Sequence, residues 1–186
     1  MGDLENRRKS LEEKFFADLD DELINEINQS QNSQKSLETL KEETGIKNVI
    51  LLQKLSDSGL GSSTLASLKF IPLLHVAWCD GNLDESEKIA IVNAADELGI
   101  KPGNINYKLL KGWLAAGHRP DRWDTWVSYI GALKSNPETA GQVKDLGAEI
   151  IAFAKDVAQA SGGLFGFGSV SGEEKSALKE IAAVFN

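Results

Sequence analysis

The apolar residues of this chain recur every three or four positions, and that spacing limits the fold to a helical one. An α-helix brings residues i, i+3 and i+4 onto one face, whereas a strand needs apolar and polar residues to alternate. No segment shows that alternation together with β-branched residues, and glycine and proline interrupt the helical stretches. The sequence therefore predicts an all-α protein without strands.

The periodic segments and their end signals divide the chain into a series of helices. We expect them at residues 3–28, 36–43, 47–56, 65–79, 84–98, 104–117 and 171–185, with one from Pro120 through Leu133 and another from Pro137 to the Gly162–Gly163 pair. Pro72 should kink or break the helix at 65–79. The clearest linker is 61–64, so we expect a helical N-terminal arm at residues 1–60 and a main domain at residues 61–186.

The first expected helix carries an apolar stripe on an otherwise charged surface. The stripe repeats at i,i+4 and is widened by two flanking residues; it consists of Leu11, Phe15, Phe16, Leu19, Leu23, Ile24 and Ile27. So much apolar surface is unfavourable in water. The pattern predicts an amphipathic arm that packs on its own domain or on a partner chain.

Charge and cysteine content narrow the classes of partner and compartment. The 186 residues carry a net charge of −8, which repels phosphate backbones and anionic lipid, so cations or basic protein surfaces are the more natural partners. Cys79 is the single cysteine, so no intramolecular disulfide can form. The N-terminus lacks the apolar segment of a signal peptide, and the longest apolar stretch is too short to span a bilayer. We expect a cytoplasmic protein with no membrane span.

The most informative motif is the turn within residues 77–88, Ala-Trp-Cys-Asp-Gly-Asn-Leu-Asp-Glu-Ser-Glu-Lys. Gly81 can take the positive φ that ends one helix, and Leu83 can anchor the turn in the core. Asp84 can cap the next helix, and Glu87 at its third position can complete a capping box. The motif predicts a tight corner between two helices.

A second segment, residues 167–175, repeats the residue pattern of this corner. The equivalent positions are Gly168 with Gly81, Val170 with Leu83, Ser171 with Asp84, and Glu174 with Glu87. Asp80 has no counterpart, because Phe167 stands there. The sequence therefore predicts an internal pseudo-repeat of two helix pairs.

The motif around Asp80 resembles the signature of the TerB-like family, which is named for tellurite-resistance proteins and also forms the N-terminal domain of the DjlA co-chaperone. The likeness covers about residues 65–185, and residues 6–15 resemble the helix that precedes the TerB-like unit in a group of uncharacterised bacterial proteins. The resemblance implies a helical bundle of two helix pairs preceded by an arm. It also implies a cation-binding acidic surface, to which Asp80, Asp84 and Glu87 would contribute.

Two metal hypotheses follow from the residues themselves. Asp80, Asp84 and Glu87 could form a weak, open divalent-cation site, or they could serve only as helix caps; a standard calcium loop is excluded because no oxygen ligands stand at its first positions. His75 and Cys79 share a helix face at i,i+4 and could begin a zinc site, or they could line the core. Beyond a weakly bound cation, we expect no cofactor.

The expected function is a non-enzymatic one, because no phosphate loop or nucleophile motif is present. We expect a stress-related interaction or scaffold module whose arm docks on an unidentified protein or on a second copy. The alternative is a DNA-binding regulator with a helix-turn-helix at residues 36–56, in which Lys47, Asn48, Gln53 and Lys54 lie on the second helix. The acidic surroundings of that segment disfavour the alternative.

Overall fold

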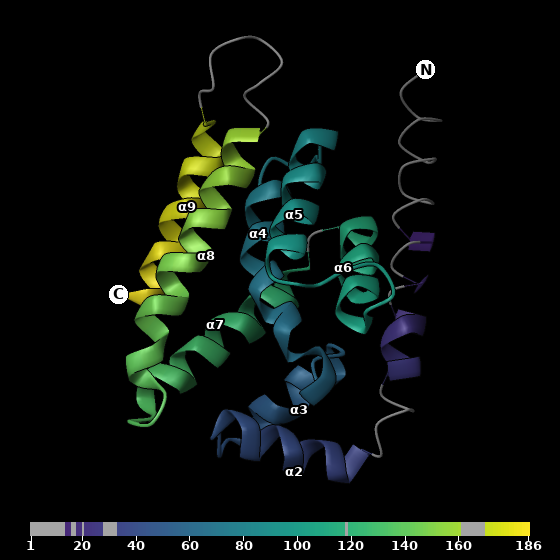
Figure 1. Ribbon diagram of the computed structural model, residues 1–186, viewed down its shortest axis with the longest axis vertical. Coiled ribbons are helices and arrows are strands. Elements are labelled where there is room, and N and C mark those ends of the chain that lie inside the picture. The colour runs from purple at the N-terminus through teal and green to yellow at the C-terminus, as the bar shows by residue number, and fades with distance from the viewer. Residues whose placement is uncertain (1–13, 16–17, 20, 28–32, 118, 161–169) are drawn as a thin grey trace.

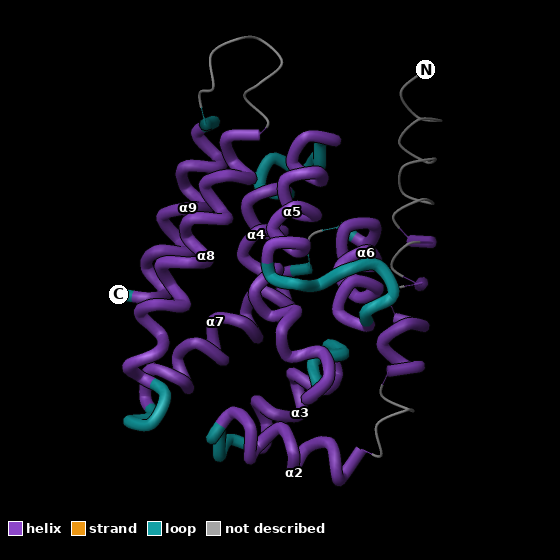
Figure 2. The backbone as a smooth tube through the Cα atoms, viewed as in Figure 1, coloured by secondary structure: helices purple, strands orange, loops and turns teal. Residues whose placement is uncertain are grey.

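The computed structural model describes residues 14–15, 18–19, 21–27, 33–117, 119–160 and 170–186. Every regular element in this part of the chain is a helix, so the all-α prediction is confirmed. Figure 1 shows the helices in chain order, and Figure 2 shows that only loops and turns join them.

Residues 21–27 are helical, and a series of labelled elements follows. These are α2 (Ser33–Thr44), α3 (Val49–Asp57), the 3₁₀ helix η1 (Ser62–Phe70), α4 (Ile71–Ala77), α5 (Glu85–Glu97), α6 (Ile105–Ala116), α7 (Pro120–Ser135), α8 (Ala140–Ala160) and α9 (Gly172–Phe185).

Most helix ends follow the local signals in the sequence. After α5, the Gly99 amide donates to the Asp96 carbonyl at 2.9 Å and the Ile100 amide donates to the Ala95 carbonyl at 2.8 Å. Gly99 has a φ of +75°, so the helix ends in a Schellman motif. Asn104 caps α6, because its Oδ1 accepts a hydrogen bond from the Asn106 amide at 2.8 Å.

One predicted break is confirmed, and one boundary differs from the prediction. The helix expected at 65–79 is divided into η1 and α4 next to Pro72, which lies in the first turn of α4, where its missing N–H removes no helical hydrogen bond. The helix expected from Pro137 begins only at Ala140. The preceding residues form a turn, in which the Thr139 hydroxyl donates to the Leu133 carbonyl at 2.8 Å. Asn136 caps this turn rather than α8.

One apolar core joins the described helices. α8 packs against α4, α5, α7 and α9, while η1 packs against α6 and α4. In Figure 1, α8 and α9 run side by side, α4 and α5 lie next to them, and the helical residues 21–27 lie near α6. The largest fully buried side chains are Trp113, Trp126 and Phe70.

The segment before residue 61 contributes to the same core. Leu40, Leu55 and Leu60 are fully buried in it. The expected linker begins η1, where the buried Thr64 hydroxyl accepts a hydrogen bond from the Gly61 amide at 2.8 Å. The division into 1–60 and 61–186 stays a prediction, but the two parts do not have separate cores.

Within the described residues, no single helix has the length and hydropathy needed to cross a bilayer. Among the described residues, one pair of consecutive segments, Val49–Asp57 and Ser62–Ala77, reaches the required length and hydropathy when the two are taken together. The two segments are bent by 79° relative to each other.

Candidate functional site

The two corners that the sequence singled out begin α5 and α9 with the same hydrogen bonds. At the start of α5, the Glu87 amide donates to Asp84 Oδ1 and the Asp84 amide donates to Glu87 Oε2, both at 3.0 Å. At the start of α9, the Glu174 amide donates to Ser171 Oγ at 3.0 Å, and the Ser171 amide donates to the Glu174 carboxylate. Both predicted capping boxes are therefore confirmed.

The positive φ predicted for the corner glycines can be checked at only one of the two corners. Gly81 has a φ of +84°, the left-handed conformation that the first corner was predicted to need. Gly168 and Phe167 lie outside the described residues, so the equivalence of the two turns stays a prediction.

The two corners place buried carboxylates near each other. Glu87 and Glu174 are each only 5% exposed. Burial raises the pKa of the Glu87 carboxyl to about 7, and the negative charges of Asp84, Glu174 and Asp80 add to the increase. Near neutral pH, Glu87 therefore carries a proton about half of the time. The two capping boxes thus contribute carboxylates to one electrostatic cluster.

The oxygen atoms of the proposed cation site are largely engaged in the corner itself. Asp80 Oδ1 accepts from the Asn82 amide at 2.9 Å, and Asp84 Oδ1 accepts from the Ser86 hydroxyl at 2.6 Å. In the part of the chain that the structure describes, no three His, Cys, Asp or Glu side chains form a group that could hold a metal ion. The weak divalent-cation site, including Glu87, stays a prediction.

His75 and Cys79 take part in different contacts. The His75 ring stacks on Trp123, with centroids 3.9 Å apart, and its Nε2 lies 3.0 Å from Glu180 Oε2 on α9. Burial, followed by the charge of Glu174, raises the pKa of the Cys79 thiol to about 11. A thiol that stays protonated is a poor nucleophile and metal ligand. The local geometry therefore favours the core-lining interpretation of this pair over a zinc site.

The α2–α3 turn differs from the helix-turn-helix expectation at one residue. Asn48 does not lie on the second helix but caps it, because its Oδ1 accepts from the Ile50 and Leu51 amides at 3.1 and 3.2 Å. Its side chain is thus held by its own helix. The next two side chains, Val49 and Ile50, are apolar and largely exposed. The DNA-binding alternative stays a prediction, but the Asn48 side chain that it placed on the second helix instead caps that helix.

The N-terminal arm is partly docked. Ile24 and Ile27 are buried in the core, and Leu23 packs against it. The side chains of Phe15 and Leu19 are 59% and 44% exposed. Two further stripe residues, Leu11 and Phe16, lie outside the described residues.

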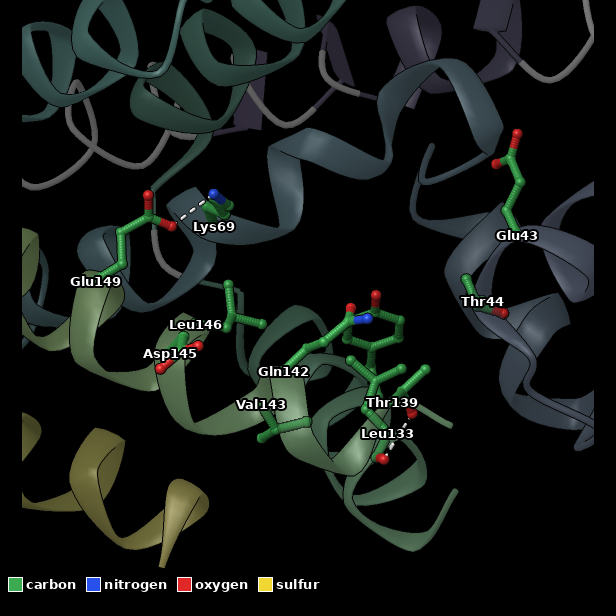
Figure 3. A pocket seen from close by; sticks show the side chains of 11 residues that line it. Glu43, Thr44, Lys69, Leu133, Thr139, Gln142, Val143, Asp145, Leu146 and Glu149 are labelled. Atoms are coloured by element: carbon green, nitrogen blue, oxygen red, sulfur yellow. Dashed lines mark hydrogen bonds and ion pairs between the residues drawn. The ribbon is translucent and has the colours of Figure 1, made fainter. Parts of the chain in front are cut away.

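Sequence reasoning missed a groove between α2, η1, α7 and α8, which Figure 3 shows from close by. Its volume is about 440 Å³, and Leu133, Val143 and Leu146 supply much of its apolar lining. Lys69 Nζ and Glu149 Oε2 form an ion pair of 2.6 Å at its edge. The lining residues come from four separate segments, so no local motif predicts the groove. The only signals in the sequence are Lys69 and Tyr129, two polar residues within otherwise apolar stretches.

Comparison of the chain with protein-family models, with curated proteins and with solved structures gives no match.

Proposed function

We propose that this chain is a non-enzymatic, TerB-like interaction module, in a stress-related or scaffolding role, that docks through its N-terminal arm. The paired corners support the TerB-like part of the proposal. Asp84 and Ser171 occupy the same place in two helix starts, and each is completed by a buried glutamate three residues later. Two copies of one corner motif are what a duplicated helix pair would contain.

The apolar stripe of the arm carries the interaction part of the proposal. Phe15, Leu19, Leu23 and Ile27 follow one another at i,i+4, so a helix places them in one row. The second half of the row packs against the core, whereas Phe15 and Leu19 remain substantially exposed. Burying such surface is favourable by roughly 25 cal/mol per Å². A complex in which a protein partner or a second copy covered Phe15 and Leu19 would be stabilised by this free energy.

The experiment uses a double substitution on the exposed half of the stripe. Phe15→Ser with Leu19→Ser removes its apolar surface while leaving the buried Ile24 and Ile27 unchanged. The matched control is Val49→Ser with Ile50→Ser, which removes two exposed apolar side chains from the first turn of α3. Each full-length variant is compared with the wild type by sedimentation equilibrium and by capture of proteins from native lysate.

We expect the arm variant to lose self-association or a specific captured protein by about tenfold or more, as for interface residues that dominate binding. The control variant should behave like the wild type, and both should melt within about 2 °C of it, because surface substitutions change stability little. Equal association and capture by the wild type and the arm variant would contradict the proposal. Greater loss in the control would assign the interaction to α3 instead.

A further inference from the structure

The groove of Figure 3 is lined by a tyrosine, Tyr129, whose side chain is mostly buried. Tyr129 lines the groove and is only 9% exposed, and no described residue forms a hydrogen bond with its hydroxyl. Burial raises the pKa of Tyr129 to about 12, so at physiological pH the group is a neutral O–H donor. The hydroxyl oxygen itself is open to the groove, where its proton is available to water or to an acceptor on a bound molecule.

The threonine hydroxyls in the lining already donate to carbonyl groups of the protein. Thr44 donates to the Leu40 carbonyl at 2.7 Å. The half-buried Thr139 likewise donates to the Leu133 carbonyl. A molecule in the groove would therefore meet the Tyr129 hydroxyl as an accessible donor that no described residue engages.

A smaller cavity continues the groove past Tyr129. It has a volume of about 220 Å³ and shares Lys69, Tyr129 and Leu146 with the groove. The rest of its lining is almost entirely apolar and includes Trp126 and Ile130. Small-molecule sites typically occupy about 300–1,000 Å³ and combine apolar surface with a few polar groups. Here the larger groove is lined mostly by polar residues, and the smaller cavity supplies most of the apolar surface. The shared tyrosine hydroxyl lies where the polar and apolar parts meet.

The charges at the groove favour neutral or positive ligands. Glu43, Asp145 and Glu149 line it, and Lys69 is the single basic residue in that lining. Lys69 is already paired with Glu149, so a negative charge remains in excess. Anions are repelled by such a surface, whereas organic cations and uncharged molecules are not.

We propose that this groove binds a small apolar molecule, uncharged or cationic, that carries a hydrogen-bond acceptor such as a carbonyl oxygen. The acceptor receives the Tyr129 hydroxyl proton in a hydrogen bond, and the apolar end enters the smaller cavity beside Leu146. This site is separate from the arm, so the inference stands or fails independently of the proposed function.

The test uses the full-length chain and Nile red, an uncharged apolar dye with a ring carbonyl. We expect saturable binding to one site, with enhanced and blue-shifted emission. Tyr129→Phe should weaken binding about fivefold to tenfold, the effect of losing one hydrogen bond. It should also shift the bound emission further to the blue, because the dye carbonyl loses its donor. Leu146→Trp, which fills the junction between the two spaces, should weaken binding more.

Tyr107→Phe on α6 is the matched control, because Tyr107 is the only other tyrosine in the chain and lines neither cavity. Its affinity and emission should equal those of the wild type. The Phe15→Ser, Leu19→Ser variant should also bind normally. The inference is overturned if the dye does not bind, if Tyr129→Phe binds like the wild type, or if only the arm variant loses binding. Tyr129→Phe removes one atom and its melting temperature shows whether it is folded.

Discussion

Replacing Glu87 with Gln removes a buried negative charge and keeps the hydrogen bond that closes the capping box. The Gln carbonyl oxygen can still accept from the Asp84 amide, since Gln and Glu both occupy this position in capping boxes. The negative charge of ionised Glu87, in contrast, destabilises the folded state. It is buried and lies near other carboxylates, which together hold the pKa of Glu87 at about 7 instead of 4.5.

This raised pKa makes the free energy of unfolding depend on pH in a defined direction. The folded state holds the Glu87 proton more tightly than the unfolded state, so stability falls as pH rises from the unfolded pKa of 4.5 through the folded pKa of about 7. The fall corresponds to about 3 kcal/mol. Loss of a favourable charge at the helix start offsets roughly 0.3–1 kcal/mol of what the variant gains.

We therefore expect Glu87→Gln to be about 2 kcal/mol more stable than the wild type at pH 8 and nearly equal to it below pH 4.5. In a chain of this size the gain at pH 8 is a rise of roughly 4–8 °C in melting temperature. The assay is urea unfolding at pH 4.5, 6 and 8. Glu85→Gln is the control, because Glu85 lies in the same helical turn but is exposed; it should change stability by less than about 0.5 kcal/mol. A variant less stable than the wild type at pH 8, or a difference independent of pH, would refute the reasoning.

Three further predictions concern the corners, α8 and the thiol. Asp84→Ala and Ser171→Ala should each cost about 1 kcal/mol in urea unfolding, because each removes the acceptor of its helix start; a negligible cost at either position would show that its capping box contributes little. Gly147→Ala should destabilise by about 1 kcal/mol or more, since its Cβ would lie 2.7 Å from an aromatic ring of α9. Gly141→Ala, where a Cβ would meet nothing within 4 Å, should instead stabilise by about 0.5–1 kcal/mol, and the reverse order would contradict the packing. Cys79 should react with iodoacetamide at pH 8 at least tenfold more slowly than free cysteine, because its raised pKa leaves little thiolate; rapid labelling of the folded protein would contradict that.

The sequence could predict the helices and their caps because those signals are local. Asp84, Asn104 and Ser171 stand at helix starts with the acceptors that the first amides need, and Gly99 stands where a left-handed residue must end α5. Where the outcome depended on packing, the prediction was less accurate. The turn before Ala140 is an example, because Thr139 bonds backward to α7 there instead of joining α8.

The candidate sites depend on tertiary structure and were only partly foreseeable. The corner motif placed Glu87 and Glu174 at equivalent positions, but nothing in their spacing showed that Glu174 lies close enough to raise the pKa of Glu87. Tyr129 occupies a buried position on α7, and its role at the groove depends on α2, η1 and α8, which lie far from it in sequence. The residue pattern of one helix does not show which other helices pack against it.

The most direct test of the central claim is to place a photocrosslinker on the exposed half of the arm. Leu19 is replaced by p-benzoylphenylalanine in the full-length chain, and Ile89, an exposed residue of α5, is replaced in a control. After irradiation in native lysate, crosslinked products are identified by mass spectrometry. We expect the Leu19 variant to give one dominant crosslink to another protein or to a second copy, with none above background from the Ile89 variant. Crosslinks confined to residues of the same chain would contradict the account, because the exposed stripe would then pack on its own domain.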